Sequence, residues 1–346
     1  MRENVSLAPF TTLRIGGRAR YLVSATSEQE IVEAFNFAAE NDLSLFVLGG
    51  GSNVLIADTG FDGLVLQVAL RGVSGFREDN GTVYSTAGAG EDWGAFVGQC
   101  VAENLQGLEC LSGIPGFVGG TPVQNVGAYG QEVSETIVSV RVFDRNSGEI
   151  LTLTNADCGF AYRTSIFNTA ARDRFIVLAV TYALTLDGTP NIAYRDLKEI
   201  FDGRTPSLAE TRDAVIRIRR AKSMVIDEMD PNSRSAGSFF KNPIIAPGEF
   251  EEVLRISEQM GFGPVPTFPA GDGLVKVPAA WLIERCGFSK GYKKGRAGLS
   301  SNHTLAVINL GDALAVDILT LKEEIEARVQ KVFSISLRTE PVFIGF

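Results

Sequence analysis

One stretch rules out most regular structure at its position and organises the rest of the sequence. Residues 113–130 read GIPGFVGGTPVQNVGAYG and include six glycines and two prolines. Glycine adopts positive φ and lets a backbone or a flat ligand approach closely, while proline fixes its own φ and lacks an N–H. The stretch therefore predicts a shaped backbone surface. A turn-rich surface loop is the alternative, but the three valines and the amides of Gln124 and Asn125, which suit the edge of a heterocycle, argue against it.

A second glycine run lies upstream, between two apolar segments, at residues 45–58 (LFVLGGGSNVLIAD). We expect this run to be a loop that joins two strands and whose successive N–H groups can bind an anion. It is no Walker loop, because no Gly-Lys-Ser/Thr follows. It is no Rossmann fingerprint either, because the third glycine and the following helix are absent. By itself the run does not specify a ligand.

Composition bounds the class of protein. A length of 346 residues predicts two or three domains. The formal net charge is −9, from 32 basic and 41 acidic residues, which disfavours nucleic acid or an anionic membrane as the main partner. An anionic substrate would need a local basic pocket. The opening residues lack an apolar signal core, and no run approaches the roughly 20 apolar residues of a membrane span.

The cysteines predict no disulfide or metal site. Cys100, Cys110, Cys158 and Cys286 are widely spaced and form no C-x-x-C pair. This spacing favours buried thiols in a reducing cytoplasm over disulfides or zinc ligands.

Taken together, the two glycine runs resemble the flavin-binding half of the UDP-N-acetylenolpyruvoylglucosamine reductase family, which acts in peptidoglycan precursor synthesis. The resemblance continues through Tyr-Arg-Thr-Ser at 162–165, Gly-Ser-Phe-Phe-Lys-Asn-Pro at 237–243 and the segment 340–345, so it covers nearly the whole chain in order. It implies an α+β, three-domain FAD-binding fold like that of PCMH/vanillyl-alcohol-oxidase-type flavoproteins. It also implies a cytoplasmic, FAD-dependent NADPH oxidoreductase with non-covalent FAD, acting as a monomer.

We expect three domains. Residues 1–68 would form a small α/β FAD-binding subdomain, residues 69–222 an α+β FAD-binding subdomain that the tail 335–346 joins, and residues 223–334 an α/β substrate-binding domain. Ser27-Glu-Gln-Glu30 and Thr205-Pro-Ser207 with Glu210 read as capping boxes that begin helices. A long helix near 313–332 should bury Ile318, Leu321, Ile325 and Val329, which recur at helical spacing.

The resemblance assigns the FAD contacts to the two glycine runs and one arginine. The run at Gly49 would wrap the pyrophosphate, and the longer stretch would line the flavin. Basic residues at the end of the helix after Ser207 suit the helix dipole, and that structural account explains most of them. The implied FAD-binding residues are Gly49, Gly50, Gly51, Ser52, Asn53, Ile114, Pro115, Gly116, Gly119, Gly120, Thr121, Gln124, Asn125, Gly127, Ala128, Tyr129 and Arg219.

The family reaction reduces an enol ether that carries a carboxylate. Charge builds on the inner carbon and the carboxylate, so the protein needs a cation, a strengthening hydrogen bond and a proton source. Arg163 can hold the carboxylate with its fork. Glu340 can supply the strengthening hydrogen bond if burial raises its pKa so that it is protonated. The match to the family implies that Ser238 donates the proton. As structural alternatives, Arg163 is a surface arginine, Glu340 an ion-paired strand end and Ser238 a turn residue.

Tyr194, Lys222 and Asn242 are the expected ligands of the UDP group, and the first marks the version of the family with a tyrosine-bearing loop. The segment 223–237 is longer than the family pattern, which leaves the match of Lys222 open. Lys241 follows Ser238 closely and could polarise the site. No metal is expected.

Two other functions remain open from the sequence. An FAD-dependent alcohol or sugar oxidase of the same fold is one, although the single histidine, His303, lies far in sequence from both glycine runs and does not favour a histidine-tethered flavin. A non-catalytic nucleotide-binding protein is the other. Reduction of the flavin by NADPH without oxygen would separate the oxidase from the reductase.

Overall fold

The chain forms two compact units. The structure is a computed structural model that describes residues 1–79 and 81–346. The chain passes between the units several times, and one of these passages divides the first glycine run after Gly51. The predicted division into three domains stays a prediction. The first unit comprises Met1–Val5, Ala19–Gly51 and Asp62–Val225, and the second Ser6–Arg18, Ser52–Phe61 and Ile226–Phe346.

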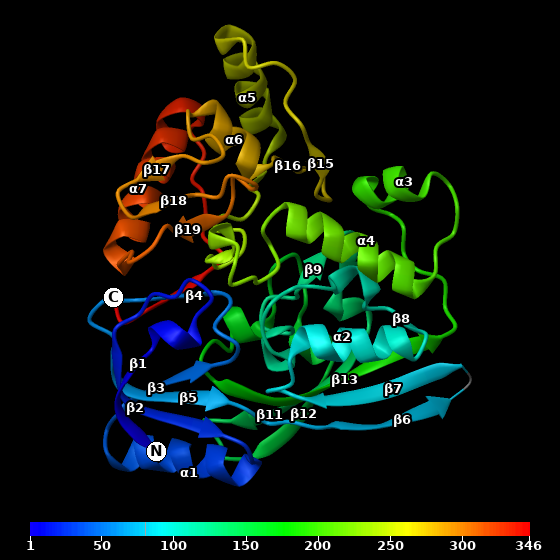
Figure 1. The fold of residues 1–346 in the computed structure, drawn as a ribbon, viewed down its shortest axis with the longest axis vertical. Coiled ribbons are helices and arrows are strands. Elements are labelled where there is room, and N and C mark those ends of the chain that lie inside the picture. The colour runs from blue at the N-terminus through cyan, green and yellow to red at the C-terminus, as the bar shows by residue number, and fades with distance from the viewer. Residues whose placement is uncertain (80) are drawn as a thin grey trace. The chain divides into compact units, whose positions relative to one another are not determined.

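The first unit is built on two main sheets and one separate short pair of strands. Its strands are β1 (Arg2–Ser6), β2 (Arg18–Ala25), β3 (Ser44–Leu48), β5 (Phe61–Val68), β6 (Val73–Asp79), β7 (Thr82–Gly88), β8 (Leu105–Gln106), β9 (Gly127–Ala128), β10 (Gln131–Glu132), β11 (Ile137–Asp144), β12 (Ile150–Thr154) and β13 (Phe175–Leu186). The smaller sheet has the order β1-β2-β5-β3, with β3 parallel to β5. The larger sheet runs β12-β11-β13-β7-β6, and its long antiparallel strands are prominent in Figure 1. Strands β9 and β10 form the separate short pair.

The helices of the first unit are α1 (Glu28–Glu40), α2 (Trp93–Ala102), α3 (Arg195–Phe201) and α4 (Leu208–Ala221). Of these, α1 and α4 begin at the predicted caps, Ser27 and Ser207. Ser207 and Glu210 form the predicted capping box of α4. Ser27 caps α1 by accepting from the N–H of Glu30 at 3.2 Å, and the Glu30 carboxylate accepts from the N–H of Thr26 at 2.6 Å.

Aromatic side chains join helix α2 of the first unit to its larger sheet. Phe96 of α2 lies 5.3 Å from the ring of Tyr182 on β13, and Trp93 lies 6.0 Å from it. The Tyr182 hydroxyl is 2.9 Å from the hydroxyl of Thr121. The glycine stretch is therefore tied directly to the hydrophobic core, and it is no loose surface loop.

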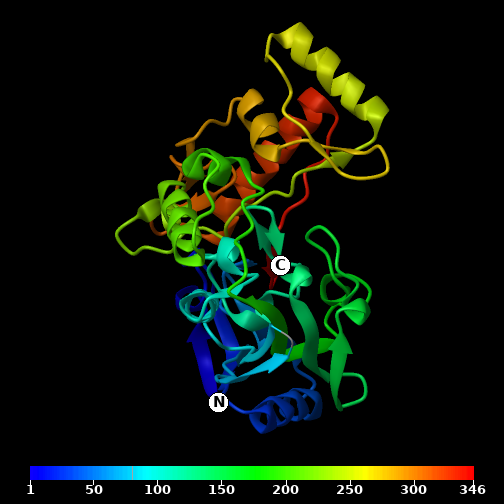
Figure 2. The same ribbon diagram turned by 90° about the vertical axis from the view of Figure 1, so that its right-hand side faces the viewer.

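The second unit combines short strands with a helical core. Its strands are β4 (Val54–Ile56), β14 (Ile244–Ile245), β15 (Phe268–Pro269), β16 (Val275–Lys276), β17 (Lys293–Lys294), β18 (Ala297–Leu299), β19 (Val307–Asn309) and β20 (Val342–Ile344), and its helices are α5 (Pro247–Met260), α6 (Ala279–Arg285) and α7 (Ala315–Phe333). Helices α5 and α6 both pack against α7 (Figure 2). The four predicted inward residues of α7 are fully buried, as expected: Ile318, Leu321, Ile325 and Val329.

The tail closes the second unit. Strand β20 pairs in parallel with β4, so that Val342 lies opposite Val54. Phe343 packs against Phe239 with ring centroids 6.3 Å apart. Short 3-10 helices complete the described elements: η1 (Ala8–Phe10), η2 (Glu109–Leu111), η3 (Val118–Gly120), η4 (Val133–Glu135), η5 (Ala156–Cys158), η6 (Ile166–Asn168) and η7 (Pro231–Ser233). In the part of the chain that the structure describes, no helix has both the length and the hydrophobicity needed to cross a bilayer.

Candidate active site

The two glycine runs meet inside the first unit. A Cβ on Gly50 would lie 2.7 Å from the Cα of Gly116, so only glycine permits this approach of the two backbones. Gly51 has a φ of 64° and Gly116 a φ of 122°, which are conformations that favour glycine. Around Gly49 and Gly120 the space is open, because an added Cβ would meet nothing within 4 Å. The runs thus form one surface whose exposed backbone a ligand can reach.

The glycine stretch is held in place by the turn that leads into α2. The N–H of Trp93 donates to the carbonyl of Gly116 at 3.0 Å, and the N–H of Gly119 donates to Ala89 at 2.8 Å. Val118 donates to Glu91 at 2.9 Å. The turn at 88–94, whose glycines superficially resemble a dinucleotide loop, is therefore a support for the stretch.

Downstream, the stretch ends in a tight hairpin between β9 and β10. Its two turn residues, Tyr129 and Gly130, have φ values of 50° and 84°. The buried Asn125 amide donates to Glu132 at 2.8 Å and to the carbonyl of Ala161 at 3.1 Å, and it accepts from the N–H of Ser134 at 3.1 Å. Since its side chain shapes the stretch, a contact between Asn125 and a cofactor stays a prediction.

Arg163 is fixed onto the glycine stretch. Its Nη2 donates to the carbonyl of Gly127 at 2.7 Å, and its Nη1 lies 3.5 Å from the carbonyl of Asn125. The neighbouring Ser165 donates to the carbonyl of Val123 at 2.6 Å, so the whole Tyr-Arg-Thr-Ser segment follows the stretch. These contacts fix the orientation of the Arg163 guanidinium.

Arg219 lies beside the start of the stretch and is almost fully buried. Its Nη2 donates to the carbonyl of Met224 at 2.8 Å, and its Nε is buried with no hydrogen-bond partner. Its Cδ and Nε would lie 3.6 Å from a Cβ on Gly113. Burial lowers the pKa of Arg219, and the neighbouring Tyr129 side chain opposes that shift. An unpaired N–H on a buried cation favours an anionic or acceptor-rich ligand at this place.

Two of the three expected UDP ligands come together next to this arginine. The Tyr194 ring stands edge-on to Tyr129 with centroids 5.2 Å apart, and the Nζ of Lys222 lies 5.9 Å from the centre of the Tyr129 ring. Lys222 also pairs with Asp196 at 2.9 Å. Asn242, the third, belongs to the second unit.

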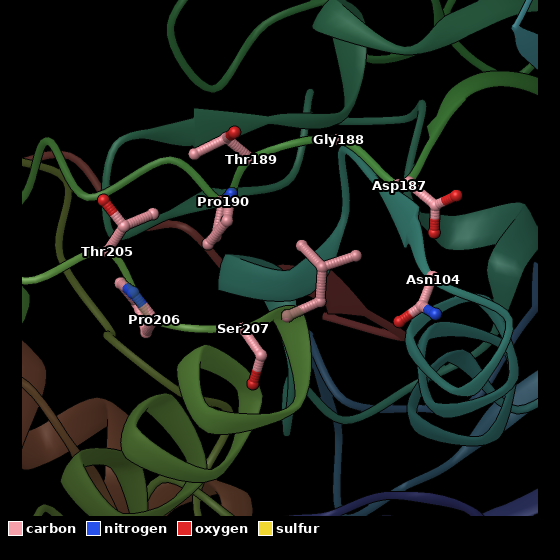
Figure 3. A pocket seen from close by; sticks show the side chains of 9 residues that line it. Asn104, Asp187, Gly188, Thr189, Pro190, Thr205, Pro206 and Ser207 are labelled. Atoms are coloured by element: carbon pink, nitrogen blue, oxygen red, sulfur yellow. The ribbon is translucent and has the colours of Figure 1, made fainter.

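The segment that carries Tyr194 is a loop whose two ends lie together. A pocket of about 230 Å³ is lined at its two sides by residues 187–190 and 205–208, together with Asn104. Figure 3 shows Thr189 and Pro190 from one end of the loop facing Thr205 and Pro206 from the other. Because its two ends lie close together, the loop leaves and returns to nearly the same place, and it carries Tyr194 and α3 between those ends.

In the second unit, the segments of Ser238 and Glu340 lie side by side. The N–H of Glu340 donates to the carbonyl of Phe239 at 2.9 Å, and Phe240 pairs with Thr339 in an antiparallel bridge. The Asn53 amide, from the first glycine run, donates to the carbonyl of Glu340 at 3.2 Å. The end of the anion-binding run is therefore joined to the segment of the proposed carboxylic acid. Ser238 and Glu340 are both half-buried.

Asn242 has one side of its amide committed. Its Oδ1 accepts from the N–H of Ala279 at the first residue of α6, at 2.9 Å. The Nδ2 is then the atom that Asn242 can offer to a substrate. His303 accepts from the N–H of Leu305 through Nδ1 at 3.1 Å, and this bond fixes its ring within its own turn.

Two residues next to the site carry no recognisable sequence signal. Asp196 follows Tyr194 closely, but only its contact with Lys222 reveals a role. Fully buried Glu109 accepts from the N–H of Asn191 at 3.0 Å and from the amide of Gln131 at 2.9 Å. It thereby joins the base of the tyrosine loop to the end of the glycine stretch. Its position in Leu-Glu-Cys-Leu does not distinguish it from a surface glutamate.

The donor set fits FAD and gives no sign of a metal. The close approach at Gly50 and Gly116, the open backbone at Gly49 and Gly120, and the buried Arg219 suit a flat, anionic dinucleotide. Among the described residues, no group of three or more His, Cys, Asp or Glu side chains is placed to hold a metal ion.

Comparison with known proteins assigns both parts of the chain. The model of the FAD binding domain matches residues 19–154. The model of the UDP-N-acetylenolpyruvoylglucosamine reductase C-terminal domain matches residues 230–344.

Full-length relatives carry the same family name. The UDP-N-acetylenolpyruvoylglucosamine reductase of Thermobifida fusca is 47% identical, and the match covers 99% of this chain and 98% of that protein. The namesake from Mycolicibacterium smegmatis is 42% identical over 99% of this chain and 95% of its own length. The crystal structure of the Thermus caldophilus reductase matches with a TM-score of 0.65 and 27% identity, covering 98% and 97% of the two chains.

Fold and site together define an FAD-binding oxidoreductase with an α+β fold, as the sequence predicts. Within that class, the chain belongs to the UDP-N-acetylenolpyruvoylglucosamine reductase family.

Proposed function

We propose that the protein reduces the enolpyruvyl ether of UDP-N-acetylglucosamine-enolpyruvate to UDP-N-acetylmuramate, with FAD as cofactor and NADPH as reductant, in peptidoglycan precursor synthesis. Relatives with this family name match it from end to end. One structural pattern carries the proposal: the segments of Arg163 and Glu340 are each bonded to a glycine run within their own unit, and the segment of Ser238 lies beside that of Glu340. Arg163 donates to Gly127 at 2.7 Å, and Asn53 donates to Glu340 at 3.2 Å.

Bound FAD supplies the hydride that the reaction requires, and the protein's own residues do the rest. Arg163 binds the substrate carboxylate, because its fork is oriented by the glycine stretch and stays charged. Glu340 adds a hydrogen bond to the same group as negative charge grows there. The Oγ of Ser238 donates a proton to the inner carbon of the enol ether.

The UDP group is bound by Tyr194, Lys222 and Asn242. Support for the first two is their position around the Tyr129 ring, and support for the third is the orientation of its amide by Ala279. We also propose that the protein is monomeric and works in the cytoplasm. The nucleotide substrate and NADPH favour that compartment, and so do four free, buried cysteines.

The experiment that tests this function separates the two halves of the reaction in Ser238→Ala. No proton is needed at the inner carbon until substrate is reduced. NADPH should therefore bleach the yellow colour of the variant at near the normal rate. Return of the colour on adding the enolpyruvyl substrate should slow by about 10²–10⁴-fold or more, the loss typical of a missing general acid. Stopped-flow absorbance measures both rates.

Two further variants control this test. Ser235→Ala removes another hydroxyl from the same segment, one that accepts from the N–H of Gly237 at 3.3 Å, and should change neither rate much. Ser238→Cys should restore part of the lost rate, since a thiol is the stronger acid. Equal slowing of bleaching and recolouring in Ser238→Ala would show that the serine is structural.

A further inference from the structure

Lys222 already has a carboxylate partner. Its Nζ lies 2.9 Å from Oδ2 of Asp196, and the two side chains are 38% and 35% exposed. Burial works to lower the pKa of Lys222, but the hydrogen bond to Asp196 and the surrounding charges outweigh it and raise that pKa. The lysine therefore stays charged, and its charge is balanced by a residue of the tyrosine loop.

The position of Asp196 is set by apolar packing and not by the ion pair. Leu197 and Phe201 of α3 are buried in a small cluster with Cys110, Ala214 and Val215. The side chain of Asp196 can turn away from Lys222 while α3 stays where these two anchors hold it.

The base of the loop is fixed as well. The N–H of Asn191 donates to Glu109 at 3.0 Å, its amide donates to Gly130 at 3.2 Å, and its carbonyl accepts from the Cys110 thiol at 3.2 Å. With base and helix both anchored, the ion pair is the part of the loop that exchanges most easily. A half-exposed pair of this kind is weak, at the level of a few-fold in an equilibrium constant.

We propose that Asp196 is the resident counterion of Lys222 and that the diphosphate of the nucleotide substrate takes its place. The inference rests on the proposed function, in which Lys222 binds that diphosphate. A diphosphate carries more charge than a carboxylate and presents the same kind of acceptor oxygens, so it wins the exchange. A nucleoside without phosphate gains nothing from Lys222, because it would leave the ion pair intact. Asp196 therefore sharpens selection for the diphosphate.

The test measures binding of UDP to the FAD-loaded protein by calorimetry in low salt. Asp196→Asn keeps the size of the side chain but removes the competing charge, so the Kd for UDP should fall about two- to five-fold. Uridine should bind equally to both proteins. Lys222→Met should weaken UDP binding. The double variant Lys222→Met/Asp196→Asn should have the same Kd for UDP as Lys222→Met alone.

A matched control lies on the same helix. Glu199 pairs with Arg195 at 2.7 Å in an exposed contact, so Glu199→Gln removes one negative charge from α3 without freeing Lys222. It should leave the Kd for UDP unchanged. Thermal unfolding of Asp196→Asn verifies that α3 keeps its fold, since Asp196 also lies in the first helical turn.

The outcomes separate the two levels of the proposal. If Lys222→Met does not weaken UDP binding, the role of Lys222 in the proposed function is overturned, and the exchange falls with it. If Lys222→Met weakens binding but Asp196→Asn leaves it unchanged or weaker, only the exchange is overturned. Tightening that persists without Lys222, or that Glu199→Gln reproduces, would also refute it by showing a general charge effect.

Discussion

At the scale of single residues, the site concentrates backbone that most side chains avoid. Asn125, Tyr129 and Arg163 have φ values of 46°, 50° and 52°. A non-glycine residue in this region is strained by about 1–2 kcal/mol, and such strain persists where surrounding contacts fix it. Here those contacts are the hydrogen bonds of the Asn125 amide and of the Arg163 fork. These hydrogen bonds hold Arg163 in one orientation before substrate arrives, in spite of the strain in its backbone.

Arg163→Lys tests whether this orientation matters beyond charge. Lysine keeps the charge but cannot bind a carboxylate through a planar fork. We expect kcat/KM for the enolpyruvyl substrate at saturating NADPH to fall about 10- to 100-fold, the loss of a charged hydrogen bond worth roughly 1.5–3 kcal/mol. Steady-state kinetics measures it.

The control for this substitution is Arg172→Lys, since Arg172 is exposed and pairs only loosely with Asp173 at 3.7 Å. Its kinetics should match those of the wild type. Unchanged kcat/KM in Arg163→Lys would mean that a point charge suffices and that the fixed fork has no part in catalysis.

At the scale of elements, glycines allow backbone segments of the second unit to cross closely, and the sequence pattern does not predict these crossings. A Cβ on Gly60 would lie 2.0 Å from the carbonyl of Arg18, and one on Gly345 would lie 2.0 Å from the carbonyl of Gly60. The crossing sits directly beside the pairing of β4 with β20. Gly60 therefore sets how closely the tail can approach the segment 52–61.

Gly60→Ala should destabilise the protein well beyond the strain of its positive φ. Gly60 and Gly203 have nearly the same φ, 83° and 79°, but an added Cβ on Gly203 would meet nothing within 4 Å. Gly203→Ala should lose about 1 kcal/mol of unfolding free energy. Gly60→Ala should lose several times more, because a backbone must also move.

Urea denaturation followed by circular dichroism measures both losses. Since the two glycines have nearly the same φ, the difference between the losses of the two variants reports mainly the clash at Gly60. Equal losses of unfolding free energy in the two variants would show that the backbone around Gly60 shifts to accept the added Cβ at no measurable cost.

Regular elements were predictable from local pattern, and the close crossings were not. The caps at Ser27 and Ser207 and the buried face of α7 follow from spacing that neighbouring residues alone determine. A crossing such as that at Gly60 depends on a residue distant in sequence, and no periodicity records it. The glycine runs predict a ligand surface because their composition is a local feature of the sequence. The contact of Asp196 with Lys222 joins two separate segments, so no local pattern predicts it.

At the scale of the whole molecule, the four cysteine thiols are all buried. Cys100, Cys110, Cys158 and Cys286 are free and buried. Burial raises the pKa of Cys158 and Cys286 to about 11 and that of Cys100 to about 12, and it raises the pKa of Cys110 as well. The reactive thiolate is therefore scarce at any pH below those values.

Native protein should react very slowly with a thiol reagent at pH 8, and four thiols should appear once denaturant is added. The rate should keep rising up to about pH 11, where Cys158 and Cys286 are half ionised, instead of levelling off near the usual thiol pKa. Absorbance of the released reagent counts the thiols. A thiol that reacts rapidly in the folded protein at pH 8 would contradict the burial described here.

The pairing of β4 with β20 also imposes an order on synthesis. Asn53 and Glu340 contact each other across 287 positions of the chain. A ribosome must therefore synthesise the chain as far as β20 before Val54–Ile56 can pair with that strand. Until then Val54–Ile56 is an apolar strand with an open edge, the kind of segment that chaperones cover and that aggregates when they do not. Non-local closure of this kind is slow, and it leaves this strand edge open to aggregation until β20 has been made.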